Sequence, residues 1–341
     1  MKFTHIIIAM AGRGYHADMI FQRQGKNAAE LVGFQTAGGN QTLAFKNRTG
    51  YPESVLPVGI PGVNLDPVFF RQIVKIDDAD VQAVLQKMNI DQSVPPVTPF
   101  FKGGSSRAKQ IFKGFLHRRL AHYVDNRNQP QTDDISHMSP YLHFGHISPV
   151  YLAAKVREAR EGQGIDRAAY LEELIVRREL ALNFVWYTPD YDRYACLPDW
   201  ARKTLAEHAG DDRPRIYDRE TLENAATHDP YWNAAMREMR YTGFMHNYMR
   251  MYWGKKILEW SASPEEAFAT TLSLNNKYFL DGRDPNSYAG VAWVFGKHDR
   301  AWFERSIFGK IRYMAASGLE RKCDIEGYVR KIDKRVRGLK K

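Results

Sequence analysis

Repeated helix-start signals are the feature that most constrains how this chain folds. From about Asp78 onward, capping side chains recur directly before prolines, which are favoured in the first turn of a helix. These pairs are Ser139-Pro140, Ser148-Pro149, Asp229-Pro230 and Ser263-Pro264. Ser263 also has Glu266 three residues later, which is the spacing of a capping box. The sequence therefore predicts a mainly α fold over most of its length.

The N-terminal part has a different pattern. Phe3–Met10 is rich in isoleucine and predicts one buried strand, whereas the residues that follow are broken by glycines and prolines. Gly12-Arg-Gly14 lacks the third glycine of a dinucleotide-binding loop, so an ordinary turn is favoured. We therefore expect a divergent N-terminal segment with some β-structure over residues 1–90 and a helical domain over residues 91–341.

Composition limits the partners and the compartment. The 341 residues include 49 Lys and Arg against 39 Asp and Glu, and the resulting net charge of +10 favours a polyanionic partner such as nucleic acid. The only two cysteines, Cys196 and Cys323, form no zinc or disulfide pattern, which fits a reducing cytoplasm. No run of eighteen apolar residues is present to span a membrane. We expect a cytoplasmic protein, with no membrane association, no evident protein partner and a monomeric state.

Three tryptophans surround the run His246–Trp260. Trp253 and Trp260 are seven residues apart, so on a helix they share one face, two turns or roughly 10 Å apart along the axis. Together with Trp232, this spacing suits electron hopping between indole rings. Large aromatic side chains also fill ordinary hydrophobic cores, and the spacing alone leaves both interpretations open.

The segment Leu171–Phe184 predicts a helix on which Glu173, Arg177 and Leu180 share one face. A Glu and an Arg four residues apart usually form a surface pair that adds little stability. Here the pair adjoins an apolar stripe, so the wall of a polar pocket is the alternative.

Residues 135–139, with two hydroxyl groups, precede a helix start whose free N–H groups favour an anion such as phosphate. Simple capping is the alternative. Upstream, Tyr123, Arg127 and Asn128 provide an aromatic ring, a guanidinium and an amide, a mixture expected where a nucleotide or a DNA backbone is bound.

Polar and aromatic side chains are dense between Leu274 and Arg312. Within this stretch, Asp281-Gly-Arg-Asp284-Pro predicts a tight turn, and a loop with satisfied polar side chains is the simplest interpretation. That interpretation does not explain why Asn, Asp, Arg and Trp gather there.

Taken in order, eight motifs strongly resemble those of class II cyclobutane pyrimidine dimer photolyases, from about Asp91 to Tyr328. They are Asn126-Arg-Asn128, Ser139-Pro-Tyr-Leu-His-Phe-Gly145, Glu172-Glu-Leu-Ile-Val-Arg-Arg-Glu-Leu180, Thr227-His-Asp-Pro-Tyr-Trp-Asn233, Met249-Arg-Met-Tyr-Trp253, Lys256-Ile-Leu-Glu-Trp260, Leu280-Asp-Gly-Arg-Asp-Pro-Asn286 and Phe308-Gly-Lys-Ile-Arg312. The resemblance implies a helical FAD-binding domain of the photolyase/cryptochrome type. It also implies light-driven repair, in which excited reduced FAD donates an electron to a pyrimidine dimer flipped out of DNA.

The resemblance also assigns roles to residues. FAD would be held by Tyr123, Ile135, Ser136, His137, Met138, Ser139, Arg177, Tyr248, Arg250, Asn275, Asp281 and Asp284. Glu173, or Glu172 if the register differs by one, would hydrogen-bond the dimer, and Met251 and Trp293 would pack on its bases. Asn275 would face the flavin N5, and Arg250 would pair with Asp281. Trp253, Trp232 and Trp260 would carry electrons from the surface to the flavin, and DNA would be contacted by Arg127, Asn128, Lys310 and Arg312.

The chain departs from the family pattern in places. Residues 1–90 are too short and too unlike the family's N-terminal α/β domain, which leaves antenna-chromophore binding in doubt. His137 and Met138 stand where the family usually has Asn and Leu. The main alternative is a cryptochrome-like blue-light receptor without repair activity, and a basic DNA-binding protein with a vestigial flavin site is a third. The dimer-binding and DNA-binding residues favour repair.

Overall fold

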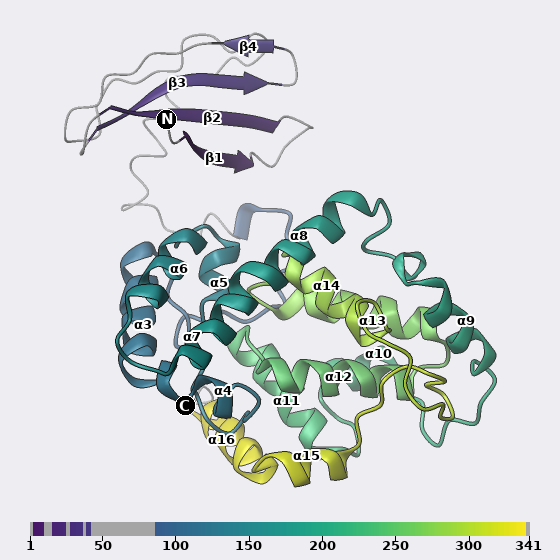
Figure 1. The fold of residues 1–341 in the computed structure, drawn as a ribbon. Coiled ribbons are helices and arrows are strands. Elements are labelled where there is room, and N and C mark those ends of the chain that lie inside the picture. The colour runs from purple at the N-terminus through teal and green to yellow at the C-terminus, as the bar shows by residue number, and fades with distance from the viewer. Residues whose placement is uncertain (1–2, 10–15, 25–27, 37–38, 42–85, 339–341) are drawn as a thin grey trace. The chain divides into compact units, whose positions relative to one another are not determined.

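The computed structural model describes residues 3–9, 16–24, 28–36, 39–41 and 86–338 (Figure 1). The chain divides into two compact units, Met1–Ile90 and Asp91–Lys341. None of the helices in the described part of the chain is long and apolar enough to cross a membrane.

The first unit contains an antiparallel sheet. Its strands are β1 (Phe3–Ala9), β2 (His16–Gln24), β3 (Ala28–Thr36) and β4 (Gly39–Gln41), and their order in the sheet follows the chain. The predicted strand at Phe3–Met10 is confirmed as β1. The pairing of β2 with β3 shifts between Ile20 and Phe21, and such a shift interrupts the two-residue alternation by which strands are predicted. The turn expected at Gly12-Arg-Gly14 and the helical start expected near Asp78 lie outside the described residues.

The second unit consists of helices, which confirms the prediction of a mainly α fold (Figure 1). The longer helices are α3 (Ser105–Arg118), α6 (Pro149–Glu158), α8 (Arg178–Tyr187), α9 (Asp199–Glu207), α11 (Pro230–Thr242), α12 (Asn247–Trp260), α13 (Pro264–Tyr278), α14 (Pro285–Val294) and α16 (Ile325–Arg337). The shorter ones are α4 (Tyr123–Asn126), α5 (Ser139–His143), α7 (Gly164–Leu171), α10 (Arg219–Glu223) and α15 (Ala316–Lys322). A π-helical turn, Glu172–Arg177, joins α7 to α8, and two 3₁₀ turns lie at Leu120–His122 and Tyr194–Cys196.

A helix begins at each of the four predicted sites, and three of the four predicted capping side chains are confirmed. The side chains of Ser148, Asp229 and Ser263 each accept a hydrogen bond from a backbone N–H in the first turn of α6, α11 and α13. The prediction that Ser139 caps its helix is wrong, because α5 begins at Ser139 itself. Met138 precedes it with helical backbone angles, φ −85° and ψ −15°, and makes no side-chain capping bond. Ser139 therefore lies inside the first turn, where its hydroxyl does not cap the helix.

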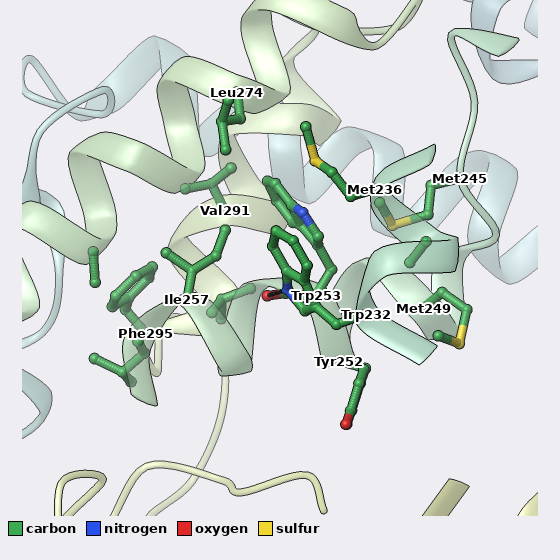
Figure 2. Packing of buried hydrophobic residues seen from close by; sticks show 14 of the residues in the cluster. Trp232, Met236, Met245, Met249, Tyr252, Trp253, Ile257, Leu274, Val291 and Phe295 are labelled. Atoms are coloured by element: carbon green, nitrogen blue, oxygen red, sulfur yellow. Dashed lines mark hydrogen bonds between the residues drawn. The ribbon is translucent and has the colours of Figure 1, made fainter. Parts of the chain in front are cut away.

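The second unit has two hydrophobic clusters. One is built mainly on α11, α12, α13 and α14, and Figure 2 shows Trp232, Trp253 and Ile257 packed within it. The other is built on α3, α5, α6 and α7, with Phe115 and Tyr170 among its buried residues. Aromatic and aliphatic side chains of this size supply most of the free energy of folding through burial.

The helices α12 and α14 approach each other closely at Gly254. A Cβ atom built on Gly254 would lie 2.7 Å from one methyl carbon of Val294 and 3.1 Å from the other. Val294 is itself buried, and its β-branched side chain has little rotamer freedom. Only glycine fits this crossing without moving one helix away from the other.

Replacement of Gly254 by alanine should therefore destabilise the protein, even though alanine is the better helix former. Overpacking costs about 1–3 kcal/mol, and the gain in helix propensity offsets about 1 kcal/mol of it. We expect the free energy of unfolding to fall by up to about 2 kcal/mol in chemical denaturation. Gly318→Ala is the matched control, because a Cβ there meets no atom within 4 Å. Equal stability of the two variants would contradict the packing argument.

Candidate functional site

A cavity of about 390 Å³ lies in the second unit and is lined by members of both hydrophobic clusters. This volume is within the range of pockets that bind small molecules and cofactors. Most of the predicted site residues line it: Tyr123, Arg127, Ile135, Ser136, His137, Met138, Ser139, Glu173, Arg177, Arg250, Met251, Trp253, Asn275, Asp281, Asp284 and Trp293. The residues come from segments up to about half of the chain apart, so the fold and not the local sequence brings them together.

An ion pair stands in one wall of the cavity. Arg250 on α12 donates through one nitrogen to both carboxylate oxygens of Asp281, at 2.9 and 3.1 Å, and through Nε to the carbonyl of Met245 at 3.1 Å. The guanidinium also lies 3.8 Å from the centre of the Phe279 ring. These contacts fix a planar cation at the cavity surface, as the predicted pairing of Arg250 with Asp281 requires.

Asn275 on α13 is almost fully buried and faces α14. Its amide lies 2.7 Å from the hydroxyl of Ser287 and donates to Oδ1 of Asn276 at 2.9 Å. Hydrogen bonds on two sides hold the amide plane in one orientation. A buried amide that is fixed in this way offers a directed polar contact to a ligand.

The turn at residues 135–139 forms another wall. His137 has a left-handed backbone, φ 55°, and its ring contacts Phe244 edge to face with 4.9 Å between ring centres. Burial lowers the pKa of His137 to about 4, so the ring is neutral at physiological pH. Its Nδ1 is buried without a hydrogen-bond partner in the described part of the chain.

Asp284 caps the start of α14, where it accepts from the backbone N–H of Asn286. Its other carboxylate oxygen lies 3.3 Å from Nδ1 of His143. Burial raises the pKa of Asp284, but the hydrogen bonds from His143 and Asn286 outweigh it and hold the pKa below its usual value. The predicted turn at 281–284 is thus also a helix start that presents its carboxylate to the cavity.

Glu173 faces the cavity, and its register is set by the π-helical turn. Arg127 donates to Glu173 at 2.5 Å and lies 5.5 Å from the centre of the Tyr123 ring. Burial of the Tyr123 ring raises the pKa of its hydroxyl to about 12, so this group remains a neutral donor.

The ion pair between Glu173 and Arg177 that the sequence predicted is wrong. Arg177 instead pairs with Glu172, five residues earlier, at 3.4 Å. In a π-helix, residues five apart face each other, whereas the prediction assumed the α-helical spacing of four. Glu172 does not line the cavity, so of the two predicted alternatives only Glu173 is in the site.

The three tryptophans contact one another in the order Trp253, Trp232 and Trp260, from the cavity into the core. Trp253 lines the cavity, and its Nε1 is buried without a partner among the described residues. Trp232 donates through Nε1 to the carbonyl of Trp253 at 2.9 Å (Figure 2). The ring centre of Trp232 is 5.7 Å from that of Trp260. Trp260 is only 3% exposed, so the expectation that it reaches the surface is wrong. The rings of Tyr217 and His228 cover it.

The other predicted residues lie outside the cavity lining: Tyr248, Asn128, Lys310 and Arg312. Tyr248 packs against the larger hydrophobic cluster, while its neighbour Asn247 lines the cavity. Arg312 lies 5.0 Å from the centre of the Trp302 ring, and Arg300 lies at the same distance from it. The Arg300–Arg312 segment therefore presents guanidinium groups held by an aromatic ring, which suits contact with phosphates.

Sequence reasoning missed several lining residues, namely Tyr170, Phe244, Met245, Phe279 and Ser287. Phe279 and Ser287 flank the Asp281–Asp284 turn, so proximity in the sequence was an available signal. Phe244 and Met245 follow α11 and carry no such signal. Within the described residues, no group of three or more His, Cys, Asp and Glu could hold a metal ion.

Proteins of known function are similar to this chain over two thirds or more of its length. The deoxyribodipyrimidine photo-lyase of Methanothermobacter thermautotrophicus is 56% identical over 239 residues, which are 70% of this chain and 52% of that protein. The enzyme of the same name from Oryza sativa subsp. japonica is 51% identical over 67% of this chain and 45% of its own length. That of Potorous tridactylus is 42% identical over 76% of this chain and 49% of its own length. The chain thus spans about half the length of these curated relatives.

Solved structures agree with the fold. The class III photolyase of Agrobacterium tumefaciens aligns with a TM-score of 0.56 and 18% identity over 71% of this chain and 48% of that one. A Synechocystis cryptochrome aligns with a TM-score of 0.51 and 19% identity over 72% of this chain and 47% of its own. No family model matches the sequence. On the strength of the sequence relatives, the chain belongs to the photolyase/cryptochrome family.

The ion pair in the cavity wall makes a stability prediction. Arg250→Met should lower the free energy of unfolding of the cofactor-free protein by about 2–3 kcal/mol, because it leaves the Asp281 carboxylate buried and unpaired. This is below the range for a fully buried pair, since the Arg250 side chain is 22% exposed. Adding Asp281→Asn should restore part of the loss.

The control is Arg202→Met, which removes an exposed ion pair with Asp199 and should change stability by less than about 0.5 kcal/mol. If the changes in the free energy of unfolding caused by Arg250→Met and Asp281→Asn simply add in the double variant, the proposed coupling between the two side chains is contradicted.

Proposed function

We propose that this protein is a light-driven DNA repair enzyme that splits cyclobutane pyrimidine dimers, using reduced FAD held in the cavity. The observation that carries the proposal is the cavity itself, because one space gathers Asn275, the Arg250–Asp281 pair, Glu173, Met251 and Trp293. The relatives named deoxyribodipyrimidine photo-lyase support it. Because its motifs resemble those of class II enzymes, class II is the proposed subtype.

The residues of the cavity fit a flavin nucleotide. Its walls combine flat apolar surfaces, such as Phe279 and Trp253, with a few fixed polar groups, which is typical of a cofactor site. The buried nitrogens of His137 and Trp253 have no partner in the described part of the chain, and a polar ligand is the usual partner of such atoms. The carboxylate of Asp281 is paired with the guanidinium of Arg250 and so repels an anionic cofactor less.

Each wall would do a separate task. Tyr123 and residues 135–139 would hold the nucleotide, while Arg250 with Asp281 and the amide of Asn275 would contact the redox-active ring. When bound and reduced, FAD supplies the electron that light transfers to a pyrimidine dimer. The protein then contributes binding, orientation and electrostatics.

Glu173, Met251 and Trp293 would receive the lesion. A base inside a duplex has to be extruded before an enzyme reaches it, and damaged bases are the least costly to extrude. Met251 and Trp293 are partly exposed and line the cavity, so they offer surfaces on which extruded bases pack. Arg127 uses one of its five donors on Glu173, which orients the carboxylate and leaves donors for a DNA phosphate.

DNA is the proposed macromolecular partner. The net charge of +10 favours a polyanion, and Lys310 and Arg312 belong to the segment in which arginines flank Trp302. Neither residue lines the cavity, so both would contact the DNA backbone around the extruded bases.

The function is tested by anaerobic blue illumination of the reduced protein with single- and double-stranded oligonucleotides that contain a dimer. We expect loss of dimers that depends on light and on FAD. Photoreduction of FAD without any loss of dimers would support a cryptochrome-like receptor instead. A protein that takes up no flavin would favour a DNA-binding role alone.

The same assay separates the two neighbouring glutamates. Glu173→Gln should slow repair by about tenfold or more, because it removes the ion pair with Arg127 that orients this side chain toward the dimer. Glu172→Gln is the matched control and should retain repair, since Glu172 lies outside the cavity and pairs with Arg177.

The tryptophan route makes a separate prediction. Trp253→Phe should slow photoreduction of oxidised FAD by about tenfold or more, a change of about 1.4 kcal/mol in activation free energy. Repair by chemically pre-reduced protein should be retained, because that reaction does not need the route. Transient absorption spectroscopy measures the first rate and dimer loss the second. Trp186→Phe, at a residue 79% exposed, is the control. Unchanged photoreduction in Trp253→Phe would exclude this route.

A further inference from the structure

Side chains of the helix α16 bind residues 130–133, the segment that precedes the cavity-lining turn at residues 135–139. Lys331 donates through Nζ to the carbonyl of Pro130 and to that of Thr132, the latter at 3.1 Å. One helical turn later, Arg335 donates to a carboxylate oxygen of Asp133 at 2.6 Å. The side chains of Lys331 and Arg335 are 19% and 27% exposed, and that of Asp133 is 49% exposed, so Lys331 is the better shielded of the two cations.

The segment of residues 130–133 forms few hydrogen bonds within its own backbone. Between residues 129 and 135 the backbone forms one turn, in which the N–H of Thr132 donates to the carbonyl of Gln129. The next carbonyls, of Asp133 and Ile135, accept from Arg119 at 3.0 and 3.2 Å. Side-chain cations from two helical regions thus hold a segment that has no regular structure, and a loop held in this way depends on those cations for its position.

The same helix reaches a second wall through a buried carboxylate. Glu238 on α11 is 1% exposed and lies 3.6 Å from Arg335. It accepts from the hydroxyl of Tyr328 on α16 at 2.7 Å and from the backbone N–H of His246 at 3.2 Å. His246 is the residue before α12, the helix that carries Arg250 into the cavity.

We propose that α16 positions the cofactor cavity, with Lys331 and Arg335 as positioning residues that hold the 130–133 segment and, through it, the lining turn at residues 135–139. This inference rests on the proposed function, since it concerns the affinity for FAD. Neither residue lines the cavity, and each acts through the groups that it holds.

The physical reason is preorganisation. Only Asp134 separates the 130–133 segment from Ile135, which is the first residue of the turn that lines the cavity. If the cations are removed, the segment regains conformational freedom in the cofactor-free protein, and that freedom has to be lost again when the cofactor binds. The effect therefore falls on affinity more than on the stability of the folded core.

The test measures FAD binding to the full chain after its cofactor has been removed. Lys331→Met and Arg335→Met each should raise the Kd for FAD about threefold to tenfold, and the double variant should raise it more. Lys334→Met and Arg337→Met are matched controls, because both side chains are exposed on the same helix. The controls should keep the Kd within about twofold of the unmodified protein. An unchanged Kd in the double variant would overturn the proposal.

A second readout separates positioning from a general loss of stability. Amide hydrogen exchange at residues 129–137 of the cofactor-free double variant should be faster, while exchange in α13 stays unchanged. Arg335→Lys, which keeps the charge, should recover part of the affinity. A lower melting temperature with an unchanged FAD-induced rise would show a purely structural role and overturn the inference. If the unmodified protein takes up no FAD, the proposed function fails, and the inference fails with it.

Discussion

The close crossing of α12 and α14 at Gly254 is the constraint on which the site depends. It holds the residues just before it on α12, Arg250 and Trp253, against the wall that α14 provides through Gly290 and Val291. A larger residue at this point would separate the two helices and widen the cavity. The positions of Arg250 and Trp253 relative to α14 therefore depend on one contact between a glycine and a valine.

Local signals in the sequence were sufficient for most helix caps but not for all of them. Ser148, Asp229 and Ser263 cap helices because capping involves only the next three residues. Ser139 does not, because the left-handed backbone at His137 is followed by a helical Met138, and the helix starts one residue earlier than the proline predicted. Such a backbone conformation is uncommon for histidine and has no sequence signal.

The residues of the candidate site were predicted largely by resemblance. The structure adds which of two adjacent residues in the sequence lines the cavity. The π-helical turn decides between Glu172 and Glu173, and packing decides between Tyr248 and Asn247. The bond from Arg127 to Glu173 joins residues 46 apart, so periodicity could not have found it. Spacing also could not show that Trp260 is covered by other rings.

The charges of the second unit are arranged in layers. At the cavity surface, acidic groups such as Asp281 and Glu173 are bonded to guanidiniums, so their fields are largely cancelled where an anionic cofactor and a nucleic acid would meet. Behind the 135–139 turn, Lys331 and Arg335 are bonded to carbonyl and carboxylate oxygens. These inner cations hold the segment that precedes the turn. The net charge of +10 therefore overstates the basic surface available to a nucleic acid, and exposed groups such as Arg300 and Lys310 have to supply that attraction.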